Sequence, residues 1–142
     1  MKDLKISIAD NDNYRTFVYK QLFEQLGYED ICTLTTPESC ISSLWLKPDV
    51  IFLDYSFGNF AGLAILKKIK AINPGIPVVL LSEIEEMNSA VEGLSHGAYE
   101  LILKGDIEEE HIKMVLQHIS IFSMPKVAKK SWVLQKVASF FW

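Results

Sequence analysis

The sequence predicts an α/β fold in which a doubly wound, five-stranded parallel sheet carries helices on both faces. Five short apolar segments alternate with five longer segments of helical periodicity within about 122 residues. Two of the short segments, Val50–Leu53 and Val78–Leu81, are apolar at every position, which is typical of strands buried on both faces of a parallel sheet. A chain of 142 residues that is 49% hydrophobic is sufficient for one domain with a full core.

Turn-forming residues divide the first half of the chain into three strands and two helices. In the first helical segment the apolar residues Phe17, Val18 and Phe23 recur at helical spacing, and Gly27 follows its last turn. Thr36 precedes a proline, which is the pattern of an N-cap followed by proline at the first helical position. The predicted elements are, in order, a strand over Leu4–Ala9, a helix over Asn13–Leu26, a strand over Asp30–Leu34, a helix from Pro37 to about Trp45 and a strand over Val50–Asp54.

The second half continues the alternation to a fifth strand and a fifth helix. A turn over Asn73–Gly75 separates the third helix from the fourth strand, and Gly97 ends the fourth helix. The predicted elements are a loop over Tyr55–Gly62, a helix over Leu63–Ile72, a strand over Val78–Leu81, a helix over Glu85–His96, a strand over Leu101–Leu103 and a helix from Glu108 to about Phe122.

Charge is distributed unevenly along the chain. Fourteen Lys and Arg against 18 Asp and Glu give a net charge of -4, which excludes a generally basic nucleic-acid-binding protein. Residues 126–142 contain four lysines and no acid, so this end carries +4 and residues 1–125 carry -8. We therefore expect residues 1–124 to form the domain and residues 125–142 to form a basic amphipathic helical extension.

The cysteines and the hydropathy pattern predict a cytoplasmic protein. No apolar run reaches the roughly 18 residues of a membrane span, and charges interrupt the N-terminal segment too early for a signal peptide. Cys32 and Cys40 form no metal-binding motif with each other or with histidines, so reduced thiols are expected.

Polar residues stand at the carboxyl ends of four predicted strands, which is the edge where open α/β sheets bind ligands. A carboxylate there can attack a phosphoryl group, Mg²⁺ prefers carboxylate oxygens, and a lysine can contact a phosphate oxygen. Each residue alone has a structural explanation, such as a helix N-cap or a solvated lysine, but together they indicate phosphoryl chemistry. These residues are Asp10, Asn11, Asp12, Asp54, Ser82 and Lys104.

Residues 3–122 resemble the receiver domain of two-component response regulators. KISIADND resembles the first strand and acidic cluster of that family, and PDVIFLDYSFGNFAGL resembles its phosphoacceptor segment, which is the most specific match. IPVVLLSE and GAYELILKG resemble the fourth and fifth strands with their terminal hydroxyl and lysine. The resemblance implies a flavodoxin-like (βα)5 fold.

The resemblance also implies a role for each site residue. Asp54 takes the position of the phosphoacceptor, Ser82 that of the switch hydroxyl and Lys104 that of the lysine that contacts phosphate. The cofactor implied is Mg²⁺. Its implied ligands are Asp10, Asp54 and the backbone carbonyl of Ser56, with Asn11 or Asp12 as a further candidate. The family implies a histidine kinase or phosphotransfer protein as donor and a downstream protein partner, with at most slow autodephosphorylation as enzymatic activity.

Four positions depart from the family pattern. Asn11 stands where a second acid is usual, so the metal site has one negative charge fewer. Glu83 follows Ser82 where a small residue is usual, and Leu101 stands at the position of the switch aromatic. Gly105 follows Lys104 where proline is common, which puts the usual cis peptide in doubt.

Two other functions remain as alternatives. The first is a receiver-like interaction module that is not phosphorylated, and the second is a phosphatase of the haloacid dehalogenase type that uses Asp10 as its nucleophile. The phosphatase pattern fits less well, because Tyr14 stands where that motif requires Thr or Val and Asp54 is left unexplained.

The C-terminal segment KVAKKSWVLQKVASFFW lies outside the family pattern. Its residues Val133, Val137, Phe140 and Phe141 fall at helical spacing, which predicts an amphipathic helix over about residues 128–141. The residues leave three interpretations open: a sixth helix that packs on its own domain or on a second copy in a homodimer, a signalling helix that would lead into an effector domain, and a basic amphipathic helix that lies on an anionic membrane or in a partner's groove.

Overall fold

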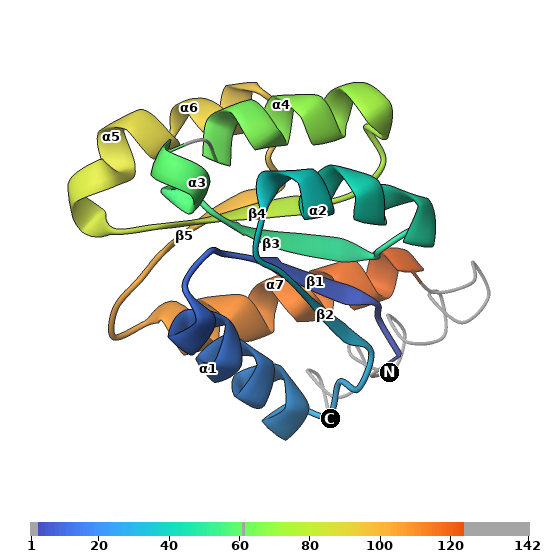
Figure 1. Ribbon diagram of the computed structural model, residues 1–142. Helices are drawn as coiled ribbons and strands as arrows, with labels where there is room; N and C mark the ends of the chain where they lie inside the picture. Colours follow the sequence, from blue (N-terminus) through green and yellow to red (C-terminus); the bar gives the residue numbers. More distant parts are fainter. Residues whose placement is uncertain (1–2, 61, 124–142) are drawn as a thin grey trace, which may run out of the picture.

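A five-stranded parallel sheet forms the centre of the computed structural model, which describes residues 3–60 and 62–123 (Figure 1). The strand order is β2-β1-β3-β4-β5, and every neighbouring pair is parallel. The predicted doubly wound fold is confirmed. The strands are β1 (Ile6–Ala9), β2 (Ile31–Leu34), β3 (Val50–Asp54), β4 (Val78–Ser82) and β5 (Glu100–Leu103).

Helices follow each strand, as the alternation predicts. Thr36 caps α2 through a reciprocal pair of hydrogen bonds with Ser39, and Pro37 is the first helical residue, so the predicted N-cap is confirmed. The helices are α1 (Asn13–Gln25), α2 (Pro37–Ser42), α3 (Phe57–Phe60), α4 (Gly62–Ile72), α5 (Met87–Ala90), α6 (Glu92–Ser95) and α7 (Glu108–Ser123), with 3₁₀ turns over Ser43–Leu46 and Ile84–Glu86.

Two predicted helices and one predicted loop differ from the structure. The helix predicted from Pro37 to about Trp45 is α2, which ends at Ser42, followed by the 3₁₀ turn over Ser43–Leu46. The helix predicted over Glu85–His96 is a 3₁₀ turn followed by α5 and α6, interrupted at Val91, where the N–H of Leu94 bonds three residues back to the Val91 carbonyl. The predicted loop over Tyr55–Gly62 contains the single turn α3, in which Gly58 and Asn59 adopt left-handed backbone angles.

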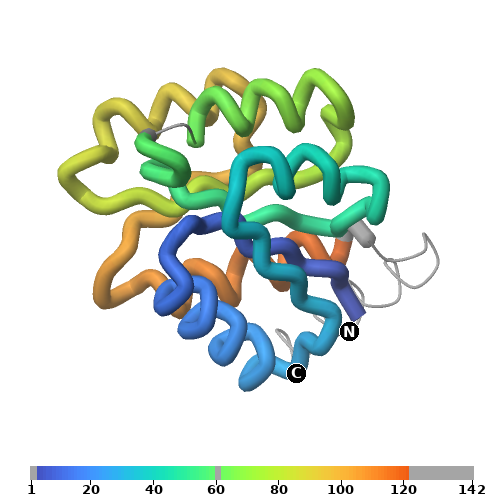
Figure 2. The backbone as a smooth tube through the Cα atoms, viewed as in Figure 1, coloured from blue at the N-terminus to red at the C-terminus, as the bar shows by residue number. Residues whose placement is uncertain are grey.

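Two hydrophobic cores lie on opposite faces of the sheet. Helices α1 and α7 cover one face, and α2 and α4 cover the other (Figures 1 and 2). Residues alternate between the cores along β3, so Phe52 packs with Phe23 of α1 while Leu53 packs under α4. The rings of Phe23 and Phe52 lie 5.0 Å apart, and burying each contributes about 2–3 kcal/mol of hydrophobic free energy.

Helix α1 turns a different face to the sheet than its apolar residues suggest. Its buried residues are Thr16, Tyr19 and Phe23, whereas Phe17 and Val18 are 56% and 44% exposed. The apolar spacing therefore predicted the helix but not its rotation, which the packing of Tyr19 and Phe23 against the sheet fixes. Phe17 and Val18 therefore remain at the surface of α1, as does Tyr14.

Within the residues that the structure describes, no helix is long and apolar enough to cross a membrane. The helix predicted over about residues 128–141 and the domain boundary predicted at residue 124 lie outside the described residues.

Gly62 allows α4 to start directly beneath the end of β3. A Cβ atom at this residue would meet the carbonyl oxygen of Tyr55 and lie 2.8 Å from that of Asp54. Because these are backbone atoms, we expect Gly62→Ala to lower the free energy of unfolding by roughly 2 kcal/mol. Urea denaturation measures the change.

Gly75→Ala is the matched control. Its Cβ atom would meet only the Asn73 side chain, at 3.4 Å, so we expect a change of less than about 0.5 kcal/mol. Equal losses in the two variants would show that the crowding at Gly62 does not limit the fold.

Candidate functional site

The carboxyl edge of the sheet brings together residues from three strand ends. Asp10 follows β1, Asp54 ends β3 and Lys104 follows β5. Both carboxylates are only 1% exposed. A carboxylate at that depth needs a cation and hydrogen-bond donors, because desolvation strongly disfavours its charged form.

Asp54 has a donor on each of its two oxygens. The ammonium Nζ of Lys104 lies 2.5 Å from Oδ1, and its side chain is 9% exposed. The hydroxyl of Ser56 donates to Oδ2 over 2.7 Å. The structure therefore brings Lys104 against Asp54, and Ser56 contacts Asp54 through its hydroxyl.

Arg15 holds the second carboxylate and reaches toward the first. Its Nε donates to Asp10 Oδ2 over 2.8 Å and its Nη2 to Asp10 Oδ1 over 3.1 Å, which is the two-pronged geometry that guanidinium groups form with carboxylates. The same Nη2 lies 3.7 Å from Asp54 Oδ2. The hydrogen bonds with Asp10 raise the pKa of Arg15 above its usual range, so the group stays charged.

Asp12 acts as the N-cap of α1. Its Oδ1 accepts the backbone N–H groups of Tyr14 and Arg15 over 2.9 and 3.0 Å. The hydrogen bond from the Arg15 backbone is the largest cause that lowers the pKa of Asp12. One oxygen of this candidate ligand is therefore committed to the helix, and Asn11 is exposed.

Ser82 lies at the same edge with its hydroxyl turned to the backbone. The residue is fully buried, and its Oγ donates to the carbonyl of Glu83 over 2.8 Å. Glu83 is half exposed and its Oε1 lies 3.7 Å from Lys104 Nζ. The acid at this unusual position therefore contacts the site lysine.

The remaining departures from the family pattern lie along β5 and directly after it. Leu101 is partly buried and packs against the core beneath α4, and Tyr99 is 36% exposed. Gly105 has a φ of 144°, and no peptide bond in the described part of the chain is cis.

The two buried carboxylates fit a divalent cation in their chemistry and in their direction. Carboxylate oxygens are the ligands that Mg²⁺ prefers. Asp10 and Asp54 converge on one point, since a single nitrogen of Arg15 lies 3.1 Å from one and 3.7 Å from the other. Among the described side chains no group of three His, Cys, Asp or Glu could hold a metal, so Asp10 and Asp54 are the two carboxylates that this edge offers to an ion.

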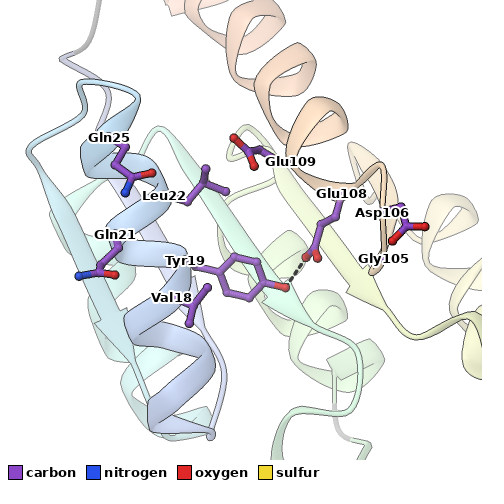
Figure 3. A pocket seen from close by; sticks show the side chains of 9 residues that line it. All are labelled: Val18, Tyr19, Gln21, Leu22, Gln25, Gly105, Asp106, Glu108 and Glu109. Carbon is purple, nitrogen blue, oxygen red and sulfur yellow. Dashed lines mark hydrogen bonds between the residues drawn. The ribbon is translucent and has the colours of Figure 1, made fainter.

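A groove of about 390 Å³ runs beside the site, between α1 and the segment that joins β5 to α7 (Figure 3). Tyr19 crosses it and donates a hydrogen bond to Glu108. Burial, the bond to Glu108 and the nearby charges of Asp54 and Asp10 raise the pKa of Tyr19, so its hydroxyl remains protonated. This contact ties α1 to the start of α7 next to the acidic residues.

Sequence reasoning identified Asp10, Asp54 and Lys104 but missed Arg15. A usable signal exists, because Asp12 caps α1 and Arg15 is the third helical residue, a position whose side chain reaches back toward the N-cap. An arginine at the third helical position, after an acid that directly follows the strand, predicts an ion pair such as that of Arg15 with Asp10 across the strand–helix turn.

Comparison with known proteins identifies a family. The family model of the response regulator receiver domain matches residues 6–117. The chain is 38% identical over 103 residues to the transcriptional regulatory protein ZraR of Escherichia coli K12, covering 72% of the chain and 23% of that protein. It is 30% identical over 88 residues to the regulatory protein LuxO of Vibrio vulnificus, covering 61% of the chain and 19% of that protein.

A solved structure agrees with the sequence matches. The receiver domain of NtrX from Brucella abortus is 25% identical and superposes with a TM-score of 0.72, over 80% of this chain and 96% of that one. The chain spans about a quarter of the length of the curated relatives it matches.

The ion pair between Asp54 and Lys104 gives a stability prediction for metal-free protein. We expect Lys104→Met to lower the free energy of unfolding by about 3 kcal/mol, because it removes the closest cation from a buried carboxylate. In the Asp54→Asn background the same change should cost much less, since no charge then needs compensation. Urea denaturation of the four proteins measures the coupling.

Lys113→Met is the matched control, because Lys113 pairs with Glu109 and Glu110 on the exposed side of α7. It should change stability little. An equal cost of Lys104→Met in both backgrounds would contradict the coupling.

Proposed function

The chain belongs to the response regulator receiver domains of two-component signalling, and we propose that it accepts a phosphoryl group on Asp54 and signals by docking to a protein partner. The observation that carries this proposal is a buried carboxylate at the sheet edge with Lys104 on one oxygen and Ser56 on the other. The transcriptional regulation in the name of ZraR is a role of that longer protein.

The proposed reaction is a single phosphoryl transfer. An oxygen of Asp54 forms a bond to phosphorus while the bond from phosphorus to the donor's leaving group breaks, and the leaving group keeps the electron pair. Lys104, whose Nζ lies 2.5 Å from Oδ1, is placed to contact the incoming phosphoryl oxygens. Ser56 donates to the other oxygen and holds the carboxylate in one orientation.

We propose Mg²⁺ as the cofactor of this step. Asp10, Asp54 and the backbone carbonyl of Ser56 would hold the ion, with water filling its other positions. When bound, Mg²⁺ neutralises charge that develops on the phosphoryl oxygens. The chain's own contribution is to hold two carboxylates that converge on one point.

The proposed phosphodonor is a histidine kinase or a phosphotransfer protein. Beside the site, α1 exposes Tyr14 and Phe17, whose side chains are 75% and 56% accessible. Exposed apolar side chains next to a reacting group support docking of a protein donor. We expect no enzymatic activity of the chain beyond slow loss of its own phosphoryl group.

The proposed output surface is the segment from Glu83 to α6. The Ser82 hydroxyl bonds the Glu83 carbonyl, and Lys104 contacts the Glu83 side chain, so a phosphoryl group that bound both donors would change both contacts. Ile84 and Val91 are exposed on this segment and offer apolar area to a downstream partner.

One observation favours the second candidate, a receiver-like module that works without phosphorylation. The guanidinium of Arg15 already occupies the space between Asp10 and Asp54. In that case no acyl phosphate forms at any Mg²⁺ concentration, while a partner protein still binds.

Intact-mass measurement after incubation with a small phosphodonor and Mg²⁺ separates the two candidates. We expect a mass increase of one phosphoryl group in the wild type. Asp54→Asn should abolish it, because an amide is a far weaker nucleophile than a carboxylate.

Asp49→Asn is the matched control, because Asp49 lies directly before β3, at the opposite end of the strand from Asp54. The Oδ2 atom of Asp49 accepts a hydrogen bond from the backbone N–H of Lys5, and an asparagine can accept the same bond. It should be labelled like the wild type. Unchanged labelling of Asp54→Asn would refute Asp54 as the acceptor, and loss of labelling only in Asp10→Asn would support the phosphatase instead.

A further inference from the structure

Arg15 supplies the positive charge between Asp10 and Asp54 that the family assigns to a metal ion. Its Nε and Nη2 take both oxygens of Asp10, and Nη2 also lies 3.7 Å from Asp54. Together with Lys104 and Ser56, these contacts give every oxygen of the two carboxylates a donor from the chain itself.

A divalent ion and this guanidinium compete for the same space. An ion that joins both carboxylates has to lie between them, at the short distances that hard cations require. Arg15 Nη2 lies between them already, 3.1 Å from Asp10 Oδ1. Two cations this close would also repel each other strongly in a partly buried site.

The charge count favours Arg15 over an incoming ion. Asp10 and Asp54 carry two negative charges, and Arg15 and Lys104 carry two positive charges, so these four inner side chains sum to zero. Asp12 and Glu83 add two negative charges, but both acids are about half exposed and lie on the far side of Arg15 and Lys104, where solvent screens them. A dication that reaches the two buried carboxylates therefore meets an inner set that is already neutral, and this set has a net charge of -1 once Arg15 leaves Asp10.

Arg15 has a second place to go. Its side chain is 36% exposed, and its Nη1 lies 3.9 Å from Asp12 Oδ2 on the solvent side. Asp12 is itself 43% exposed and uses only its other oxygen to cap α1. The guanidinium can therefore rotate from Asp10 toward Asp12 and keep an ion pair in both positions.

We infer that Arg15 is the resident cation of this acidic site and that a divalent metal ion binds only by displacing it from Asp10. Arg15 thereby sets the metal concentration at which the site is loaded, and Asp12 receives the released guanidinium. The inference rests on the proposed function in assigning Asp10 and Asp54 as metal ligands.

Metal binding without any phosphodonor tests this inference. Mn²⁺ shares the preference of Mg²⁺ for oxygen ligands and is paramagnetic, so loss of the free Mn²⁺ signal in electron paramagnetic resonance measures binding to the full chain. We expect Arg15→Gln to lower the dissociation constant by about tenfold or more, because it removes both the occupant and one positive charge. The control Lys20→Gln removes a charge from the exposed side of the same helix and should leave the constant within about twofold.

Arg15→Lys keeps the charge but cannot bind Asp10 through two nitrogens, so its dissociation constant for Mn²⁺ should fall between those of the wild type and Arg15→Gln.

Thermal unfolding adds a second readout. Without metal, Arg15→Gln leaves Asp10 unpaired and should melt below the wild type, and Mn²⁺ should raise its melting temperature more than that of the wild type. If Arg15→Gln does not fold without metal, Arg15→Lys and its melting shift decide.

Equal or weaker Mn²⁺ binding in the folded Arg15 variants, or no binding in any variant, would overturn the inference.

The labelling of Asp54 reports separately on the proposed function. Tighter metal binding in Arg15→Gln without a phosphoryl group on Asp54 leaves the inference standing and refutes phosphorylation. Phosphorylation of Asp54 with unchanged metal binding in Arg15→Gln does the reverse.

Discussion

The carboxylate of Asp54 is 1% exposed, and removing such a charge from water costs several kcal/mol unless cations and donors compensate it. Lys104 and Ser56 provide that compensation directly, and Arg15 adds a more distant positive charge. The same constraint applies to Asp10, which Arg15 and the backbone N–H of Asp12 satisfy. The site is thus a set of charges that stabilise one another, so removing one of them leaves its partner buried without a compensating charge.

The sheet determines which charges can meet. Strands β1 and β3 are neighbours, so Asp10 and Asp54 come from adjacent strand ends, whereas β5 is separated from β3 by β4. Lys104 bridges that gap because a lysine has a long side chain whose apolar stem can cross a neighbouring strand. Ser82 ends the strand in between, where its hydroxyl bonds the next backbone carbonyl. This arrangement links Asp54, through Lys104 and Glu83, to the exposed segment that follows β4.

Helix α1 connects the chemistry of the site to its surface. Its first turn contains the cap Asp12 and the cation Arg15, and its next turns alternate between exposed Phe17 and buried Tyr19. Tyr19 bonds Glu108 at the start of α7, so the two helices on this face are joined beside the acidic residues. A change in the charges held by Arg15 therefore occurs on the helix that exposes apolar side chains beside the site.

The sequence by itself determined the alternation of strands and helices and placed Asp10, Asp54 and Lys104 at strand ends, because spacing, turn residues and apolar runs are local properties. It could not determine the rotation of α1, since Phe17 and Phe23 are equally apolar and only packing buries one of them. It could not show the break at Val91, the hydroxyl direction of Ser82 or the role of Arg15. These depend on which groups lie within hydrogen-bond distance, and the burial of Asp10 and Asp54 by the assembled sheet decides that a guanidinium is held between them.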